Sequence, residues 1–184
     1  IREIKIIGNE QFSDGQLRNE MSLAISKWHS VITHDGRYSK AELTADVERI
    51  NSFYLDRGYL GFKVVETDVS ISPNKQDLFI SIVVAEGPRY TVGSIGVEVE
   101  GDISRNDVKQ LIILEQGVVY SRQDLVASQT AIEEVLADQG YAFATVNSIP
   151  EQRRDAAIVN FNFIVDPGPY VYVRRINIVG NEST

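Results

Sequence analysis

The sequence contains the same segment twice. Residues 38–59, YSKAELTADVERINSFYLDRGY, return as residues 120–141, YSRQDLVASQTAIEEVLADQGY, at an offset of 82 positions (120 minus 38). A segment that recurs in phase must adopt the same local structure and bury the same face in each copy. Within a chain of 184 residues, this spacing predicts two small units in tandem, each with a modest core of its own.

Each copy of the segment carries the signals of a helix with a defined start and end. A serine opens it, and an acidic residue follows three positions later, so the serine oxygen can accept a hydrogen bond from a free N–H group of the first turn. A glycine suited to positive φ closes it, and the tyrosine after the glycine can fold back onto the last turn. The predicted caps are Ser39, Gly58 and Tyr59 in the first copy, and Ser121, Gly140 and Tyr141 in the second.

The stretches on either side of these helices alternate in the manner of β-strands. A strand and a first helix precede each long helix, and two strands joined by a polar turn follow it. We therefore predict an α+β fold of tandem β-α-α-β-β units, each a three-stranded mixed sheet with two helices on one face. The predicted boundaries are residues 1–89 and 90–171 for the two units, and residues 172–184 for the first strand of a truncated third repeat.

The sequence also predicts the extent of two further elements. Leu17, Met21 and Ala24 are expected on one face of a single first helix, which begins with a capping box in the first copy. In the second copy, the strand after the long helix is expected to span residues 143–149 and to end before Pro150.

Charge and composition exclude several classes of protein. The chain has 18 Lys and Arg residues against 26 Asp and Glu, a net charge of −8, so it lacks the basic surface that nucleic-acid binding requires. It has no Cys, which excludes disulfides and thiolate metal sites. No apolar run reaches the roughly 18 residues of a membrane-spanning helix. Because the sequence opens directly on a strand pattern and ends where a third copy would begin its helix, we expect it to be a piece of a longer protein.

Three residues of the first copy deserve consideration as metal ligands. His29, His34 and Asp35 are of the right types to hold a metal ion in a small metal-dependent enzyme. Their spacing on an irregular segment fixes no ligand geometry, and the second copy has no counterpart, so solvated side chains are the simpler interpretation. The sequence has no phosphate-binding loop, nucleophile elbow or H-E-x-x-H motif. We therefore predict that the chain is not an enzyme and uses no cofactor.

Several motifs that recur in phase resemble those of POTRA (polypeptide-transport-associated) repeats. They are the strand exits I-x-I-x-G-N at residues 4–9 and 176–181, the helix ends D-R-G-Y and D-Q-G-Y at residues 56–59 and 138–141, and the repeat ends E-G-P and P-G-P at residues 86–88 and 167–169. The resemblance covers the whole chain and is closest to the middle repeats, the third and fourth, of an outer-membrane assembly factor. One departure is the second strand exit, where residues 98–101 read E-V-E-G.

The resemblance implies a periplasmic scaffold with chaperone-like activity, which forms part of an outer-membrane protein. The partners it implies are unfolded outer-membrane protein clients, periplasmic lipoproteins of an assembly complex, and the membrane barrel of the parent chain. The nearest alternative functions are those of a two-partner-secretion or other protein-translocating transporter and of a division protein of FtsQ type. Several contiguous repeats favour the barrel proteins over the division protein.

The predicted sheet also indicates a binding site on physical grounds. A three-stranded sheet cannot close, so its outer strands expose N–H and C=O groups that can pair with an incoming extended chain. A right-handed crossover places the first strand beside residues 78–85 and leaves the strand at residues 62–72 outermost. The corresponding strand of the second copy is a weaker candidate, because Pro150 lacks an N–H donor. The expected peptide-binding edge residues are Phe62, Val64, Val65, Thr67, Val69 and Ile71, and Trp28 is a candidate partner contact.

Overall fold

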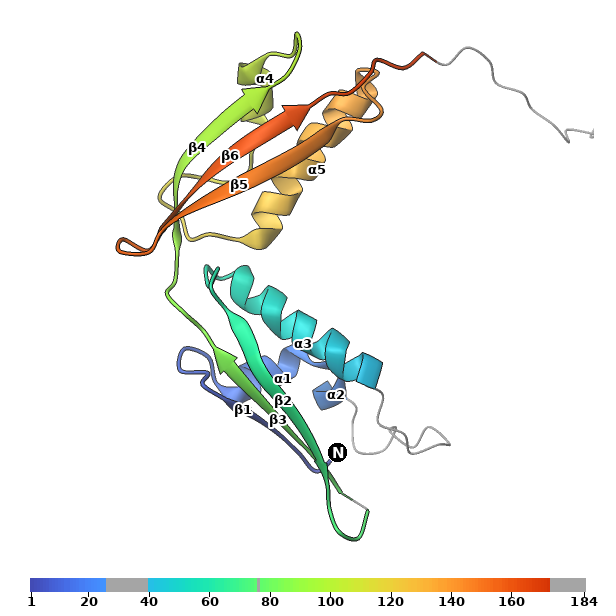
Figure 1. Ribbon diagram of the computed structural model, residues 1–184, viewed down its shortest axis with the longest axis vertical. Coiled ribbons are helices and arrows are strands. Elements are labelled where there is room, and N and C mark those ends of the chain that lie inside the picture. The colour runs from blue at the N-terminus through green and yellow to red at the C-terminus, as the bar shows by residue number, and fades with distance from the viewer. Residues whose placement is uncertain (26–39, 76, 173–184) are drawn as a thin grey trace, which may run out of the picture.

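The computed structural model describes residues 1–25, 40–75 and 77–172, which form two units, each with its own sheet (Figure 1). The first unit contains β1 (Glu3–Ile7), α1 (Asp14–Glu20), α2 (Ser22–Ile25), α3 (Lys40–Leu55), β2 (Lys63–Ile71) and β3 (Leu78–Ala85). The second unit contains β4 (Thr91–Val99), α4 (Arg105–Gln110), α5 (Arg122–Asp138), β5 (Thr145–Arg153) and β6 (Ile158–Asp166).

The two sheets share one topology. The strand order is β1-β3-β2 in the first and β4-β6-β5 in the second. In each, the last strand of the unit is central, with the first strand parallel to it and the middle strand antiparallel. The predicted fold class, three-stranded mixed sheets with helices, is confirmed. β2, which falls within the predicted range 62–72, lies at one edge of the first sheet, as predicted.

Alternation along the central strands decides which face of each sheet is buried. Every second side chain of β3 and β6 is buried, and the long helix of the same unit covers that face (Figure 1). Residues of α3 and α5 at helical spacing complete the two cores. The cores include Ile50, Tyr54, Ile80 and Ile82 in the first unit, and Ile132, Leu136, Phe161 and Phe163 in the second.

The first helical segment of the first unit is divided at Met21, so the expectation of one continuous helix was wrong. Met21 is fully buried and has an extended backbone (φ −88°, ψ 137°). The buried carboxylate of Asp46 in α3 accepts hydrogen bonds from the backbone N–H groups of Ser22 (2.7 Å) and Leu23 (2.9 Å) and pairs with Arg49. Asp46 therefore caps α2 from a different helix.

β5 continues through Pro150 to Arg153, so the predicted end of this strand before the proline was also wrong. Val146 directs its N–H and its C=O toward side chains of α5, away from β6. Backbone direction alternates along an antiparallel strand, so Pro150, four positions on, has the same orientation. Its missing N–H therefore falls on the free side of the strand and interrupts no ladder bond.

Some of the sequence-based predictions concern residues that the structure does not describe. Those residues are Trp28, His29, His34, Asp35, the cap Ser39, and residues 173–184 of the predicted third repeat.

Candidate functional site

The outer edge of β2 presents regularly spaced backbone groups that β3 does not use. The C=O of Leu78 accepts a hydrogen bond from the N–H of Arg2 (2.8 Å), so Leu78 faces β1 rather than β2. Ile80 and Ile82 share this orientation, because backbone direction alternates along a strand. In the antiparallel pair, Ile71 lies opposite Leu78, Val69 opposite Ile80, and Thr67 opposite Ile82. Ile71, Val69 and Thr67 therefore point their N–H and C=O groups outward.

A β-bulge limits the regular part of this edge. The register between β2 and β3 shifts between Val64 and Glu66, so Val65 is an extra residue in β2. Its side chain is 60% exposed, and the bulge restores Val64 to the face that carries Thr67 and Val69. The uninterrupted edge that a second strand can follow therefore runs from Thr67 to Ile71.

An open groove of about 400 Å³ lies between this edge and α3. Leu43 and Val47 form its apolar floor on the helix side, and Val69 continues it on the strand side. Because the outward-facing residues of β2 also direct their side chains toward α3, a strand added here would place alternate side chains over the groove. The groove is lined by Lys40, Leu43, Thr44, Val47, Thr67 and Val69. Leu43 and Val47 thus contribute both to the core of the first unit and to the groove.

The predicted edge residues take three different positions. Phe62 precedes β2, is buried, and stacks on Tyr54 with ring centroids 4.0 Å apart, so it belongs to the core and we remove it from the proposed edge. Val65 lies in the bulge. Val64, Thr67, Val69 and Ile71 share the side of β2 that faces α3, and Ile71 is 63% exposed.

The long helices α3 and α5 both end at a glycine with positive φ. Gly58 and Gly140 have positive φ values of +94° and +99°, the conformation that the sequence pattern predicted. The N–H groups of Tyr59 and Tyr141 bond to the C=O groups five residues back, on Tyr54 (3.1 Å) and Leu136 (2.9 Å). These are Schellman endings. At the start of α5, the Ser121 hydroxyl accepts the N–H of Asp124 at 3.2 Å.

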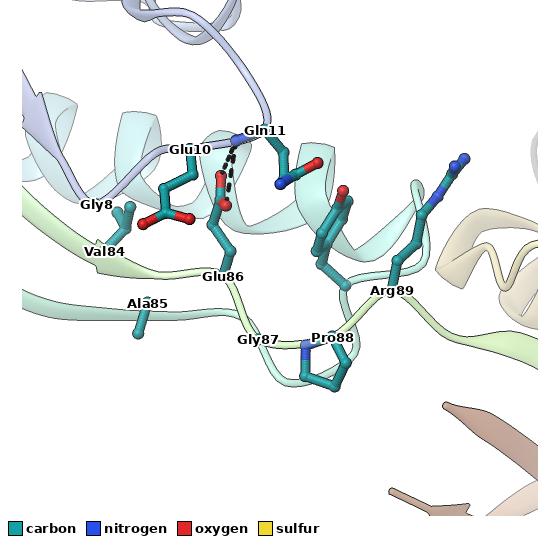
Figure 2. A pocket seen from close by; sticks show the side chains of 10 residues that line it. Gly8, Glu10, Gln11, Val84, Ala85, Glu86, Gly87, Pro88 and Arg89 are labelled. Carbon is teal, nitrogen blue, oxygen red and sulfur yellow. Dashed lines mark hydrogen bonds between the residues drawn. The ribbon is translucent and has the colours of Figure 1, made fainter. Parts of the chain in front are cut away.

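A second hollow, of about 630 Å³, lies where β3 leaves the first sheet (Figure 2). Its buried acid, Glu86, accepts the N–H of Gln11 (3.1 and 3.2 Å) and the hydroxyl of Tyr54 (2.7 Å). Burial first, and the hydrogen bond to Glu86 second, raise the pKa of Tyr54 far above its usual range. Since this carboxylate is already bonded to two parts of its own unit, we interpret it as a structural tie between the chain after β1, α3 and the end of β3.

Two features are absent from the residues that the structure describes. Within them, no group of three His, Cys, Asp or Glu side chains is placed to hold a metal ion. Over the same ranges, no helix has both the length and the apolar character needed to cross a bilayer.

The chain is similar in sequence to outer membrane protein assembly factors of several bacteria. The chain is 28% identical over 185 residues to the outer membrane protein assembly factor BamA of Neisseria meningitidis, covering all of this chain and 23% of that protein. BamA of Buchnera aphidicola is also 28% identical, with 30% of its length covered. The chain thus spans less than a third of the length of these curated relatives.

Solved structures agree with the sequence comparison. The crystal structure of Haemophilus influenzae BamA POTRA3-5 superposes with a TM-score of 0.82 at 25% identity, covering all of this chain and 72% of that one. BamA of Haemophilus ducreyi lacking POTRA domains 1-3 has the same fold, with a TM-score of 0.71 at 21% identity, over 90% of this chain and 29% of that one. The periplasmic, outer-membrane-associated location implied by the sequence agrees with these relatives.

The family model of POTRA, described as surface antigen variable number repeat, matches residues 1–87 and again residues 90–168. These two matches follow the two sheets and together span most of the sequence. The chain therefore belongs to the POTRA family.

Proposed function

We propose that this chain is a periplasmic scaffold and client-binding segment of an outer-membrane β-barrel assembly protein, and that it receives unfolded client strands at the β2 edge. The observation that carries this proposal is the outward direction of the backbone groups of Thr67, Val69 and Ile71 beside an apolar groove. These groups form a template for one more antiparallel or parallel strand.

The chemistry of the groove suits the strands of membrane barrels. Such strands alternate apolar and polar residues, so all apolar side chains of one strand point to the same side. If that side faces α3, the apolar residues contact Leu43, Val47 and Val69, while the polar residues lie on the side of Glu66 and Asp68. Backbone pairing would supply most of the affinity and alternation most of the selectivity, which allows one edge to receive many clients.

The same proposal extends to the parent protein. We place the units at residues 1–89 and 90–171, followed by the first strand of a further repeat at residues 172–184. We infer that the parent chain carries its own membrane barrel and that accessory periplasmic lipoproteins dock on the repeats, as suggested by the similarity to assembly factors. Trp28 stays a candidate contact for such a partner. A protein-translocating transporter is the alternative, in which the β2 edge would receive an exported substrate.

Photo-crosslinking to an unfolded outer-membrane barrel protein tests the site. Probes at Asp68 and Ser70 flank the free edge on the face away from α3 and leave the groove intact. Matched controls are Lys5 on β1, the other edge of the same sheet, and Glu48, exposed on α3. We expect stronger capture at Asp68 and Ser70 than at both controls. Equal capture at all four positions, or stronger capture at Glu48, would reject the edge as the site.

A further inference from the structure

The outer edge of the second sheet is already bonded by side chains of its own helix. The N–H of Val146 in β5 donates to Oε1 of Glu133 (3.0 Å), and the C=O of Val146 accepts from Nε2 of Gln129 (3.0 Å). Nε2 of Gln129 also lies 3.4 Å from the hydroxyl of Ser148. Both helix residues belong to α5, which packs directly beside β5.

These two side chains occupy the positions of a missing strand. A neighbouring strand would offer a C=O to the N–H of Val146 and an N–H to its C=O. Glu133 supplies the acceptor and Gln129 the donor, so the first outward pair of β5 is satisfied without a partner chain. Hydrogen bonds to an ionised carboxylate are stronger than those between neutral groups, so an incoming strand has a strong bond to displace.

The first unit lacks this arrangement. Subtracting the repeat offset of 82 from Gln129, Glu133 and Val146 gives Val47, Asn51 and Val64. Val47 lines the open groove instead of bonding the strand. In the parts of the chain that the structure describes, no side chain is bonded to the backbone of Val64, or to that of Thr67, Val69 or Ile71 further along β2.

A third residue reinforces the difference between the edges. Val146, Ser148 and Pro150 all direct their backbone groups outward from β5. The N–H of Val146 is already bonded to Glu133, and Pro150 has no N–H to offer. Val69 is the counterpart of Pro150 in the first unit, because it pairs with Ile80 as Pro150 pairs with Phe161. Unlike the proline, Val69 has a backbone N–H that an incoming strand can use.

We propose that Gln129 and Glu133 are specificity-determining residues that close the β5 edge to strand addition, so that an extended client is directed to β2 rather than to β5. This inference rests on the proposed function of β2. It adds that two units of the same fold have different roles because two helix positions differ between them. These positions are Val47 and Asn51 in the first unit, and Gln129 and Glu133 in the second. The second unit is then a spacer or docking unit rather than a second client site.

Exchange of these residues between the units tests the inference. The opened variant carries Gln129→Val and Glu133→Asn, alone and together with Pro150→Val, and the closed variant carries Val47→Gln and Asn51→Glu. Probes at Asn147 and Ile149 report capture by β5, and probes at Asp68 and Ser70 report capture by β2.

Matched controls are Glu134→Asn and Ala45→Gln, which change exposed positions of the same helices. Glu133→Gln keeps an acceptor oxygen and should keep the edge closed.

We expect the opened variant to gain capture at β5 by at least about threefold and the closed variant to lose capture at β2 by a similar factor. Unchanged capture at both edges, with wild-type β2 still active, overturns the inference and leaves the proposed function intact. Absence of capture at β2 in the wild-type chain overturns both.

Amide hydrogen exchange gives a readout that needs no client. The N–H of Val146 should exchange slowly in the wild-type chain and at least about threefold faster in Glu133→Asn, with Glu134→Asn unchanged. Fast exchange of Val146 in the wild-type chain would show that its hydrogen bond to Glu133 is not formed, and would contradict the inference. Thermal unfolding of each variant identifies any loss of capture that comes from unfolding of the unit.

Discussion

Oδ1 of Asp56 accepts a hydrogen bond of 2.9 Å from the backbone N–H of Gln123, although the two residues belong to different units. Asp56 directly follows α3, and Gln123 lies in the first turn of α5. One free N–H of α5 is thus capped by its own Ser121 side chain, and another by a residue of the preceding unit. The start of the second long helix is therefore tied to the end of the first.

Backbone hydrogen bonds complete the same joint. The C=O of Gly58 accepts the N–H of Tyr90 (2.7 Å), and the C=O of Tyr90 accepts the N–H of Tyr120 (3.1 Å). Leu60, which follows the end of α3, packs against the core of the second unit. A chain held at this many points sets the direction in which the second unit leaves the first, and hence where the β2 edge lies relative to the rest of the protein.

Replacement of Asp56 tests the capping bond. Asp56→Ala removes the acceptor and the negative charge near the N-terminus of α5, so we expect a loss of about 1 kcal/mol in the free energy of unfolding of the second unit. Asp56→Asn keeps an acceptor and should lose less. Urea unfolding followed by a probe in each unit measures the change. Equal stability of Asp56→Ala and the wild-type chain would show that the bond contributes nothing.

Gly58 is required at the joint by both its conformation and its surroundings. Its φ is +94°, and an added Cβ would lie 2.8 Å from Cγ1 of Val119 and 2.9 Å from the C=O oxygen of Tyr90. We expect Gly58→Val to destabilise the chain by more than about 1 kcal/mol. Gly117→Val is the matched control, because Gly117 also has positive φ (+84°) but nothing lies within 4 Å of its added Cβ. The two variants should differ, and an equal loss would mean that close packing at the joint is unimportant.

Most of the fold could be predicted because its signals are local in the sequence. The Ser13 capping box, the Ser104 and Ser121 caps and the glycine endings each depend on residues within one turn of each other. Repetition of the pattern in two copies then made the order of elements and the edge position of residues 62–72 predictable.

What the sequence did not reveal depends on contacts between distant segments. The break at Met21 is stabilised by Asp46, on another helix, so periodicity alone indicated one continuous helix. Pro150 by itself predicts the end of a strand, because the direction of its missing N–H follows only from the pairing of β5 with β6 in the assembled sheet. The groove beside β2 could not be predicted, because helical periodicity does not show that Val47 lies at the rim of the core rather than within it.

Two buried tyrosines predict a loss of stability in alkaline solution. Burial raises the pKa of Tyr120 to about 12, with Arg122 opposing the shift, and raises the pKa of Tyr54 further. In the unfolded chain both titrate near pH 10, so above about pH 10 the unfolded state binds fewer protons and the free energy of unfolding falls as pH rises. Below about pH 10 the contribution of the neutral hydroxyls is fully present.

Urea unfolding from about pH 8 to about pH 11 measures this effect. Each of Tyr54→Phe and Tyr120→Phe removes one titrating group, so each should make the decline above about pH 10 shallower than in the wild-type chain. Identical pH profiles for the wild-type chain and both variants would contradict the prediction.

A proline scan of β2 distinguishes its free side from its paired side. Thr67 directs its N–H outward, so Thr67→Pro removes a donor that only an incoming strand would use, and an edge strand tolerates it. Asp68, the next residue, directs its N–H toward β3 opposite Ser81, so Asp68→Pro removes a ladder bond of the sheet. We expect Thr67→Pro to abolish client capture at the β2 probes with little change in thermal stability, and Asp68→Pro to destabilise the first unit by about 1–3 kcal/mol through the lost ladder bond. If Thr67→Pro folds and still captures client as the wild-type chain does, strand addition at β2 is not how the client is held, because the regular edge from Thr67 to Ile71 offers no other way to pair along its full length.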